Sequence, residues 1–195
     1  MSYLVVGLGN IGAEYAGTRH NMGFLVLDAL AKASNTSFST LRYGSLTEVR
    51  MAGKHVFLLK PSTYMNLSGK AVHYWMREER IPLEQVLVVV DDIALPLGAL
   101  RMRKQGSDGG HNGLRSINEA LGTTTYTRLR VGIGSDFGRG QQVDYVLGDW
   151  SPQESKELPF IFQKCNDAIQ TFVLEGPDRA MNRCNTTEKK TEPLA

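Results

Sequence analysis

Four polar segments of this sequence carry side chains that could do chemistry, and each lies beside an apolar run. In chain order these side chains are Asn10, His20, Asn66, the Asp91-Asp92 pair and Asn112. Loops on a rigid scaffold are where binding and catalytic residues concentrate. Neutral amides both donate and accept hydrogen bonds. The asparagines could therefore hold a carbonyl group or a water molecule without recognising a particular side chain.

His20 and Asp91 together have the chemistry of a general base and its partner. Asp91 closes a strongly apolar run, where a carboxylate is costly unless it has a partner. A carboxylate beside an imidazole fixes the tautomer of the ring and stabilises its protonated form. An imidazole whose pKa is about 6.5 can take a proton from water at neutral pH. We therefore predict that His20 and Asp91 touch, although a structural histidine and a turn leading to Pro96 would leave the same pattern.

Simpler interpretations exist for the other polar segments. Asn66 and Asn112 both lie near an expected helix start, where an asparagine often serves as the cap. The glycines from Gly7 to Gly12 fit the G-x-G-x-x-G pattern of dinucleotide-binding proteins. In those proteins a helix starts at once, whereas here the expected helix begins about nine residues later. We interpret these glycines as turn formers that place Asn10.

Other catalytic motifs are missing from the sequence. It contains no G-x-S-x-G elbow, no H-E-x-x-H pair and no P-loop. The four histidines do not form a spaced set of metal ligands, so no metal site is predicted. Cys165 and Cys184 lack metal-ligand spacing and are expected to be reduced thiols.

The elements that must position these residues alternate along the chain. We expect strands near 3–8, 46–51, 56–59, 86–90, 99–103 and 129–133, and helices near 21–33, 67–79, 112–121 and 152–176. This order predicts a single α/β domain over residues 1–184, with a mixed, mostly parallel twisted β-sheet and helices on both faces. Residues 185–195 are expected to form a polar, frayed tail. Ligands bind at the carboxyl ends of such strands, so the polar segments should meet at one rim.

Composition and charge narrow the class of protein. The chain has 195 residues, of which 42% are hydrophobic, so it can bury an ordinary core. We find neither a signal-peptide pattern nor an apolar run long enough to span a membrane, and we expect a cytoplasmic protein. Residues 100–139 hold seven basic and three acidic side chains in a chain of net charge +2. This local excess suits a polyanionic partner, although an ordinary solvated face would look similar.

A family resemblance rests on six blocks of sequence. They are VVGLGNIGAEYAGTRHNMGF, KPSTYMNLSGKAV, VVVDDIALPLG, GGHNGL, RLRVGIG and DYVLGDWSPQE. Their order and spacing, from about Tyr3 to Glu154, resemble bacterial-type peptidyl-tRNA hydrolases. The resemblance implies hydrolysis of the ester that joins a peptide to the 3′ ribose of tRNA, which recycles tRNA from dropped peptides. It further implies a monomer that needs no cofactor.

The resemblance also implies roles for individual residues. His20 would be the general base for water, Asp91 would orient it, and Asn10 would position a substrate whose amino group is blocked. The residues that would line the site for the peptide and the CCA end are Tyr15, Tyr64, Asn66 and Asn112.

A basic clamp for the tRNA 5′ phosphate is implied as well. Its members would be Arg103 and Arg130, which lie in the basic segment. Two positions depart from the usual family pattern: Ala94 replaces a frequent acid, and Asp108 adds an acid near the expected phosphate path. Two other functions stay open, namely a non-catalytic RNA-binding protein on the same fold and a dinucleotide oxidoreductase.

Overall fold

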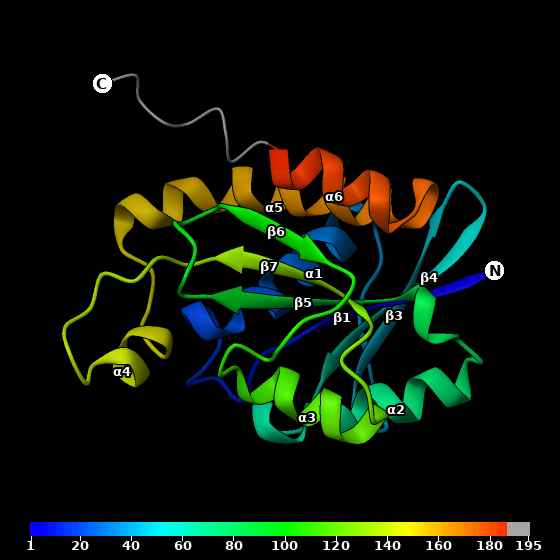
Figure 1. Ribbon diagram of the computed structural model, residues 1–195, viewed down its shortest axis with the longest axis horizontal. Coiled ribbons are helices and arrows are strands. Elements are labelled where there is room, and N and C mark those ends of the chain that lie inside the picture. Colours follow the sequence, from blue (N-terminus) through cyan, green and yellow to red (C-terminus); the bar gives the residue numbers. More distant parts are fainter. Residues whose placement is uncertain (187–195) are drawn as a thin grey trace.

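Within residues 1–186, which the computed structural model describes, seven strands form one sheet. The strands are β1 (Ser2–Gly7), β2 (Ser39–Leu41), β3 (Gly44–Met51), β4 (Lys54–Pro61), β5 (Val86–Asp92), β6 (Leu100–Arg103) and β7 (Thr127–Gly132). Their order across the sheet is β2-β3-β4-β1-β5-β7-β6. The central strands β4, β1, β5 and β7 are parallel, and antiparallel strands flank them on both sides. The carboxyl ends of the four parallel strands therefore share one rim of the sheet (Figure 1).

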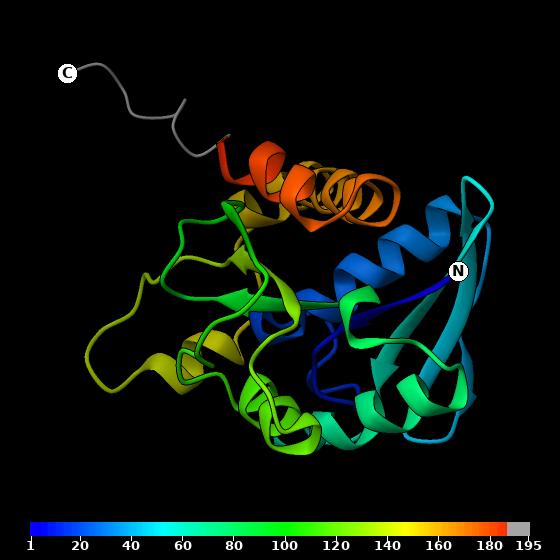
Figure 2. The same cartoon turned by 45° about the vertical axis from the view of Figure 1, so that its right-hand side comes forward.

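Helices cover both faces of the sheet (Figure 2). The α-helices are α1 (Met22–Ala33), α2 (Ser68–Glu78), α3 (Asn112–Leu121), α4 (Gln142–Val146), α5 (Pro152–Glu175) and α6 (Pro177–Thr186). Three single-turn 3₁₀ helices accompany them: η1 (Arg19–Asn21), η2 (Met65–Leu67) and η3 (Leu83–Gln85). Helices α5 and α6 lie on one face of the sheet and α2 and α3 lie on the other. The fold is therefore an α/β sandwich of three layers, as the sequence predicted.

The core forms two apolar layers, one on each side of the sheet. Along β1, Tyr3 and Val5 pack into the cluster that contains residues of α1 and α5. Leu4 and Val6 pack into the opposite cluster, with residues of α2 and α3. Successive side chains of a strand point to opposite faces. A continuous apolar run is therefore typical of a parallel strand that is covered on both faces.

Two glycines let α1 begin close against the sheet. A Cβ atom on Gly7 would lie 2.2 Å from the carbonyl oxygen of Gly23. A Cβ atom on Gly23 would lie 2.3 Å from the backbone nitrogen of Leu8 and 2.6 Å from the oxygen of Val89. These neighbours are backbone atoms that cannot move aside. The glycine pattern thus serves close packing, and α1 begins at Met22, well after the glycine loop.

Most expected elements are present with small shifts of their ends. The sequence missed β2, whose three residues are exposed, and α4, which has five residues. It also missed α6, whose last turn includes Asn185, the first residue of the predicted tail. The Asn185 side chain accepts a hydrogen bond from the Met102 N–H at 2.8 Å and donates one to the Met102 oxygen at 3.0 Å. The rest of the predicted tail, residues 187–195, lies outside the described residues.

None of the helices in the described part of the chain has both the length and the apolar character that crossing a membrane requires.

Candidate active site

Asn10 lies at the rim, in the loop after β1, and two asparagines hold this loop in place. The Asn10 N–H donates to Asn21 Oδ1 at 2.8 Å, and Asn21 Nδ2 donates back to the Asn10 oxygen at 2.9 Å. The Asn10 side-chain oxygen accepts the N–H of Met65, at the start of η2, at 2.9 Å. Since that oxygen is occupied, the Asn10 side-chain NH₂ is the group that remains to donate to a ligand.

His20 and Asp91 are in contact, as the sequence predicted. His20 Nδ1 lies 2.9 Å from Asp91 Oδ2, at the place where η1 meets the end of β5. The Asp91 side chain is 4% exposed and the His20 side chain 16% exposed, so the pair opens to solvent on the histidine side.

A second histidine also binds Asp91. His111 Nε2 lies 2.9 Å from Asp91 Oδ1, and the centroids of the His20 and His111 rings are 5.1 Å apart. Burial alone would raise the pKa of Asp91, but the two imidazoles outweigh it and hold this pKa well below its usual value. Burial lowers the pKa of His20, whereas the charge and hydrogen bond of Asp91 raise it, and the net shift is upward.

The hydrogen bonds define which ring nitrogens carry protons. His111 Nδ1 accepts the Gly113 N–H at 3.1 Å, which makes His111 the N-cap of α3. Its Nε2–H therefore donates to the carboxylate. His20 likewise donates its Nδ1–H to Asp91, because an ionised carboxylate only accepts. The unprotonated Nε2 of His20 is left to act as a base.

His20, Asp91 and His111 also form a group of potential metal ligands. Their ligand atoms all lie within 4.8 Å of one another. The sequence analysis missed this group because the three residues have no regular spacing. Both carboxylate oxygens already accept N–H groups at hydrogen-bond distance, an arrangement suited to controlling protons. That the site works without a metal stays a prediction.

Two asparagines were expected to line the site, and their role there stays a prediction. Asn66 is exposed within η2, and Asn112 is exposed as the first residue of α3. Neither is a helix cap, since His111 caps α3 and Leu67 stands before α2. The Gly69 N–H donates to Ser116 Oγ at 2.9 Å, which holds the start of α2 against α3.

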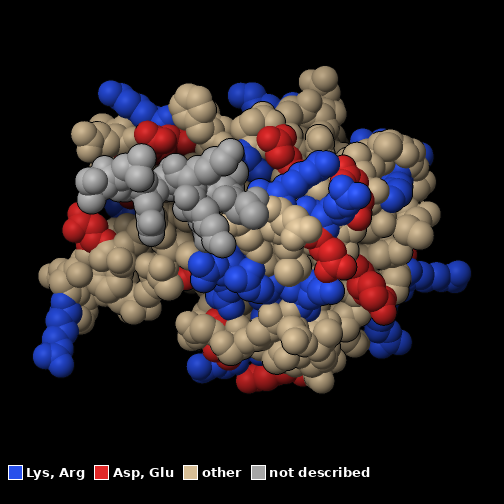
Figure 3. All heavy atoms as spheres, turned by 45° about the horizontal axis from the view of Figure 1, so that its top comes forward, with Lys and Arg blue, Asp and Glu red and all other residues tan. Residues whose placement is uncertain are grey.

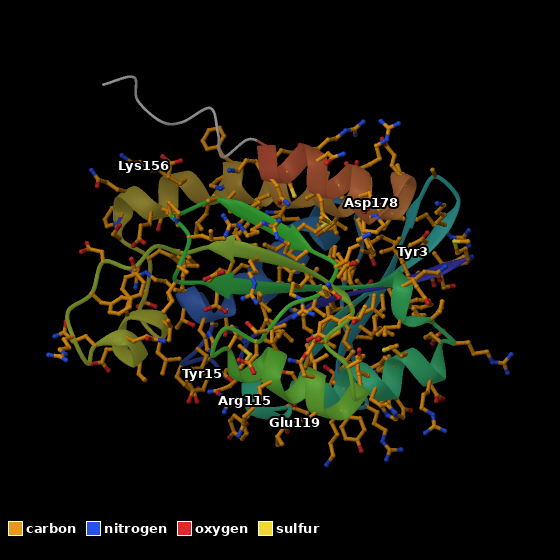
Figure 4. All side chains as sticks on the ribbon, viewed as in Figure 1. Tyr3, Tyr15, Arg115, Glu119, Lys156 and Asp178 are labelled. Carbon is orange, nitrogen blue, oxygen red and sulfur yellow. The ribbon has the colours of Figure 1, made fainter. Side chains whose placement is uncertain are left out.

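Two tyrosines were also expected at the site. Tyr64, just before η2, is 61% exposed. Tyr15 is partly exposed in the turn between β1 and η1, where its N–H donates to the Gly12 oxygen. Figure 4 labels Tyr15 toward the lower left of the molecule. The side chains of both tyrosines are therefore accessible to a ligand.

Four arginines lie on one face of the β6–β7 ribbon. Arg101 is opposite Arg130 and Arg103 is opposite Arg128 in this antiparallel pair. The alternating residues Leu100, Met102, Leu129 and Val131 pack toward the cluster of α5 and α6. The arginine side chains therefore point to the other face of the sheet, where Arg128 is buried and Arg103 is exposed. Lys and Arg side chains gather near the middle of the surface in Figure 3.

The predicted phosphate-binding arginines differ in how firmly they are held. Arg103 is exposed, and its Nη1 donates to the oxygen of Met102 at 3.0 Å. Arg130 is 16% exposed and donates to the Ser107 oxygen at 2.8 Å. The Asp108 carboxylate accepts the Gly110 N–H at 2.8 Å and lies 3.8 Å from Arg115 Nε. Asp108 thus helps to form the turn and is not paired with either predicted clamp residue.

Sequence reasoning missed two buried groups that organise the site. One is His111, which precedes the predicted Asn112 and bonds Asp91. The sequence did offer one sign of its role, because a histidine at an expected helix start could partner the carboxylate that closes the apolar run. Arg128 is fully buried and donates to the backbone oxygens of Gly106, Thr124 and Tyr126, so it holds the loop before α3. No pattern in the sequence distinguishes this arginine from its exposed neighbours.

Comparison with known proteins places the chain in a family. The family model for peptidyl-tRNA hydrolase matches residues 4–192. The chain is 55% identical to the peptidyl-tRNA hydrolase of Cytophaga hutchinsonii and 53% identical to that of Porphyromonas gingivalis. These alignments cover 95% of this chain and 99% and 100% of the two relatives. A crystal structure of peptidyl-tRNA hydrolase from Acinetobacter baumannii matches with a TM-score of 0.87 at 33% identity, over 94% of each chain. The chain belongs to the peptidyl-tRNA hydrolase family.

Proposed function

We propose that this chain hydrolyses the ester between a peptide and the 3′ ribose of tRNA, with water as the nucleophile and His20 as the general base. The observation that carries the proposal is the hydrogen bond from His20 Nδ1 to Asp91 Oδ2 at 2.9 Å. It fixes the tautomer and leaves the Nε2 lone pair on the accessible side of the ring.

The reaction needs one proton acceptor and one group that stabilises negative charge. His20 Nε2 takes a proton from water while the water oxygen attacks the ester carbonyl carbon. Asp91 stabilises the imidazolium that forms. The carbonyl oxygen becomes an oxyanion, to which the Asn10 NH₂ can donate. The imidazolium then returns its proton to the leaving 3′ oxygen of the ribose, so the base is regenerated.

His111 supports this chemistry without being the base. Its Nε2–H donates to the Asp91 oxygen that His20 does not use. Its Nδ1 is occupied by the Gly113 N–H, so neither nitrogen is available to a water. His111 therefore keeps the carboxylate ionised and oriented toward His20.

The surrounding residues are proposed to bind the substrate. The exposed side chains of Tyr15, Tyr64, Asn66 and Asn112 would contact the peptide and the CCA end. Arg103 and Arg130, on the shared face of β6 and β7, would contact the 5′ phosphate region. We further propose that the protein acts as a monomer in the cytoplasm, where translation supplies its substrate.

The deciding experiment compares two tRNA substrates. Release of N-acetyl-aminoacyl groups from tRNA is measured beside release of the unacetylated aminoacyl groups from the same tRNA. We expect rapid release of the blocked group and slow release of the free one. Binding of tRNA without hydrolysis of either substrate would instead indicate a non-catalytic RNA-binding protein, and a nucleotide titration followed by fluorescence tests the dinucleotide alternative.

A further inference from the structure

Each of the three guanidinium nitrogens of Arg19, the residue before His20, has a hydrogen-bond partner. Arg19 Nη2 lies 2.7 Å from Glu154 Oε1, and its Nε lies 3.4 Å from Glu154 Oε2. Its Nη1 donates to the Tyr145 oxygen at 3.0 Å. The guanidinium also stacks on the Tyr145 ring, with Cζ 4.2 Å from the ring centroid. The Arg19 side chain is 12% exposed, so these contacts are largely shielded from solvent.

The partners of Arg19 are themselves fixed. Glu154 belongs to the capping box of α5, where its carboxylate accepts the Ser151 N–H at 2.8 Å and Ser151 Oγ accepts the Glu154 N–H at 3.1 Å. The Tyr145 hydroxyl donates to the oxygen of Ile133, just after β7, at 2.6 Å. Figure 1 shows α4 on the side toward which the strands β5 and β7 point, and a short segment joins it to the start of α5. Arg19 therefore contacts residues that are themselves held at the start of α5 and after the end of β7.

The turn that carries His20 is short, and contacts with other segments hold it: Asn21 bonds Asn10, His20 bonds Asp91, and Arg19 bonds the segment around α4 and α5. η1 has three residues, and its N-cap Thr18 makes no side-chain cap hydrogen bond. The buried Thr18 hydroxyl has no hydrogen-bond partner among residues 1–186. The Arg19 N–H donates to the Gly148 oxygen at 3.1 Å, so the backbone of this turn is also held by the segment around α4.

We propose that Arg19 is a positioning residue for the general base: by joining η1 to Glu154 and Tyr145, it keeps the His20 ring on Asp91 with Nε2 toward the substrate. This inference rests on the proposed role of His20. Arg19 cannot itself act on the substrate, because Glu154 and Tyr145 occupy its guanidinium. Small displacements of a reacting group reduce rates strongly, so a loosened η1 would lower kcat more than it weakens binding.

The kinetic test uses Arg19→Ala, Arg19→Lys and Glu154→Gln with N-acetyl-aminoacyl-tRNA as substrate. For Arg19→Ala we expect kcat to fall roughly 10- to 100-fold while KM changes less than about twofold. Arg19→Lys keeps the charge but loses the bidentate contact and the ring stacking, so it should restore only part of kcat. Glu154→Gln should lower kcat in the same way, and the double variant Arg19→Ala/Glu154→Gln should be no slower than Arg19→Ala alone.

The matched control is Lys54→Ala. Lys54 Nζ donates to the Val173 oxygen at 2.9 Å, near the other end of α5 and away from the rim. Like Arg19, it is a cation that attaches α5 to another element. Its removal is expected to lower stability while leaving kcat and KM unchanged, which separates general loosening of α5 from misplacement of His20.

A spectroscopic test reads the position of His20 directly. His20 Nδ1–H and His111 Nε2–H both donate to Asp91. In the NMR spectrum of protein labelled with ¹⁵N-histidine, the two ring nitrogens that bond this carboxylate are observed separately. In Arg19→Ala or Arg19→Lys the His20 signal should shift or broaden, while the His111 signal stays in place. A structural effect on the whole site would move both signals.

The outcomes separate this inference from the proposed function. Wild-type turnover in His20→Ala would overturn the proposed function, whatever Arg19 does. An inactive His20→Ala beside an Arg19→Ala with unchanged kcat and an unchanged His20 signal would overturn only the role of Arg19. A rise in KM with intact kcat would also overturn it, because that result would assign Arg19 to substrate binding.

Discussion

His20 donates to Asp91 at 2.9 Å although 71 positions separate the two residues in the sequence. They meet because β1 and β5 are neighbouring parallel strands. The chain leaving β1 turns back through η1, and Asp91 lies at the same rim at the end of β5. The contact is therefore a product of the sheet topology, and the chemistry depends on it.

Removal of the imidazole tests the general base. His20→Ala should lower kcat by roughly 10² to 10⁴, the usual contribution of general-base catalysis. Release of peptide from blocked tRNA measures this change, with circular dichroism to verify the fold. His73→Ala, which changes an exposed histidine on α2, is the control and should keep wild-type turnover.

The pH profile tests the partnership with Asp91. Catalysis needs neutral His20, so kcat/KM should rise with pH through the pKa of His20, and that pKa is raised from 6.5. Asp91→Asn removes the charge that raises this pKa and leaves burial, which lowers it. The rise of kcat/KM with pH should therefore occur at lower pH in this variant. The value of kcat/KM at high pH should fall roughly 10²- to 10⁴-fold because the His20 tautomer is no longer fixed. If kcat/KM of Asp91→Asn rose at the same pH as in the wild type, Asp91 would not be the group that raises the pKa of His20.

Salt dependence tests the basic clamp. Arg103→Ala should weaken tRNA binding and reduce the slope of log K against log salt by about 0.7 to 0.9, the loss of one phosphate contact. Hydrolysis of a small ester that lacks tRNA should not change. Arg50→Ala, an exposed arginine on β3, is the control and should keep the wild-type slope. An equal slope in Arg103→Ala and the wild type would remove Arg103 from the clamp.

A stability measurement tests the close packing at the start of α1. Ala is favoured over Gly within helices by about 1 kcal/mol. At Gly23, however, the added Cβ would lie 2.3 Å from the backbone nitrogen of Leu8, just after β1. The clash should dominate, and Gly23→Ala should lower the free energy of unfolding by about 2 to 4 kcal/mol. Urea unfolding measures the change, and Gly138→Ala, which meets only the flexible end of Gln141, should have a small effect.

The sequence predicted those parts of the fold that depend on strong patterns among residues close together in the chain. The apolar runs around Val5 and Val88 predicted the central strands, and the capping box at Ser151 predicted the start of α5. The His20–Asp91 contact was predicted because a carboxylate that closes an apolar strand is costly unless it has a partner. The strand and helix patterns depend on backbone periodicity and helix-cap chemistry, which residues close in the sequence determine.

The rest of the site depends on tertiary contacts that leave no local pattern. His111 binds Asp91 only because α3 starts beside the end of β5. Arg128 looks like any other basic residue, and its burial follows from the loop that folds over it. The five residues of α4 are too few to show helical periodicity. Such features become visible only when distant segments are placed together.

The amide of Asn185 has a consequence for self-association. β6 is an edge strand, and an edge strand offers unpaired N–H and C=O groups to strands of other molecules. Asn185 bonds both the N–H and the oxygen of Met102, as a peptide group of an added strand would. This side chain thus blocks the pairing of β6 with a strand of another molecule. A chain cut before Asn185 would expose the Met102 N–H and C=O groups to such pairing.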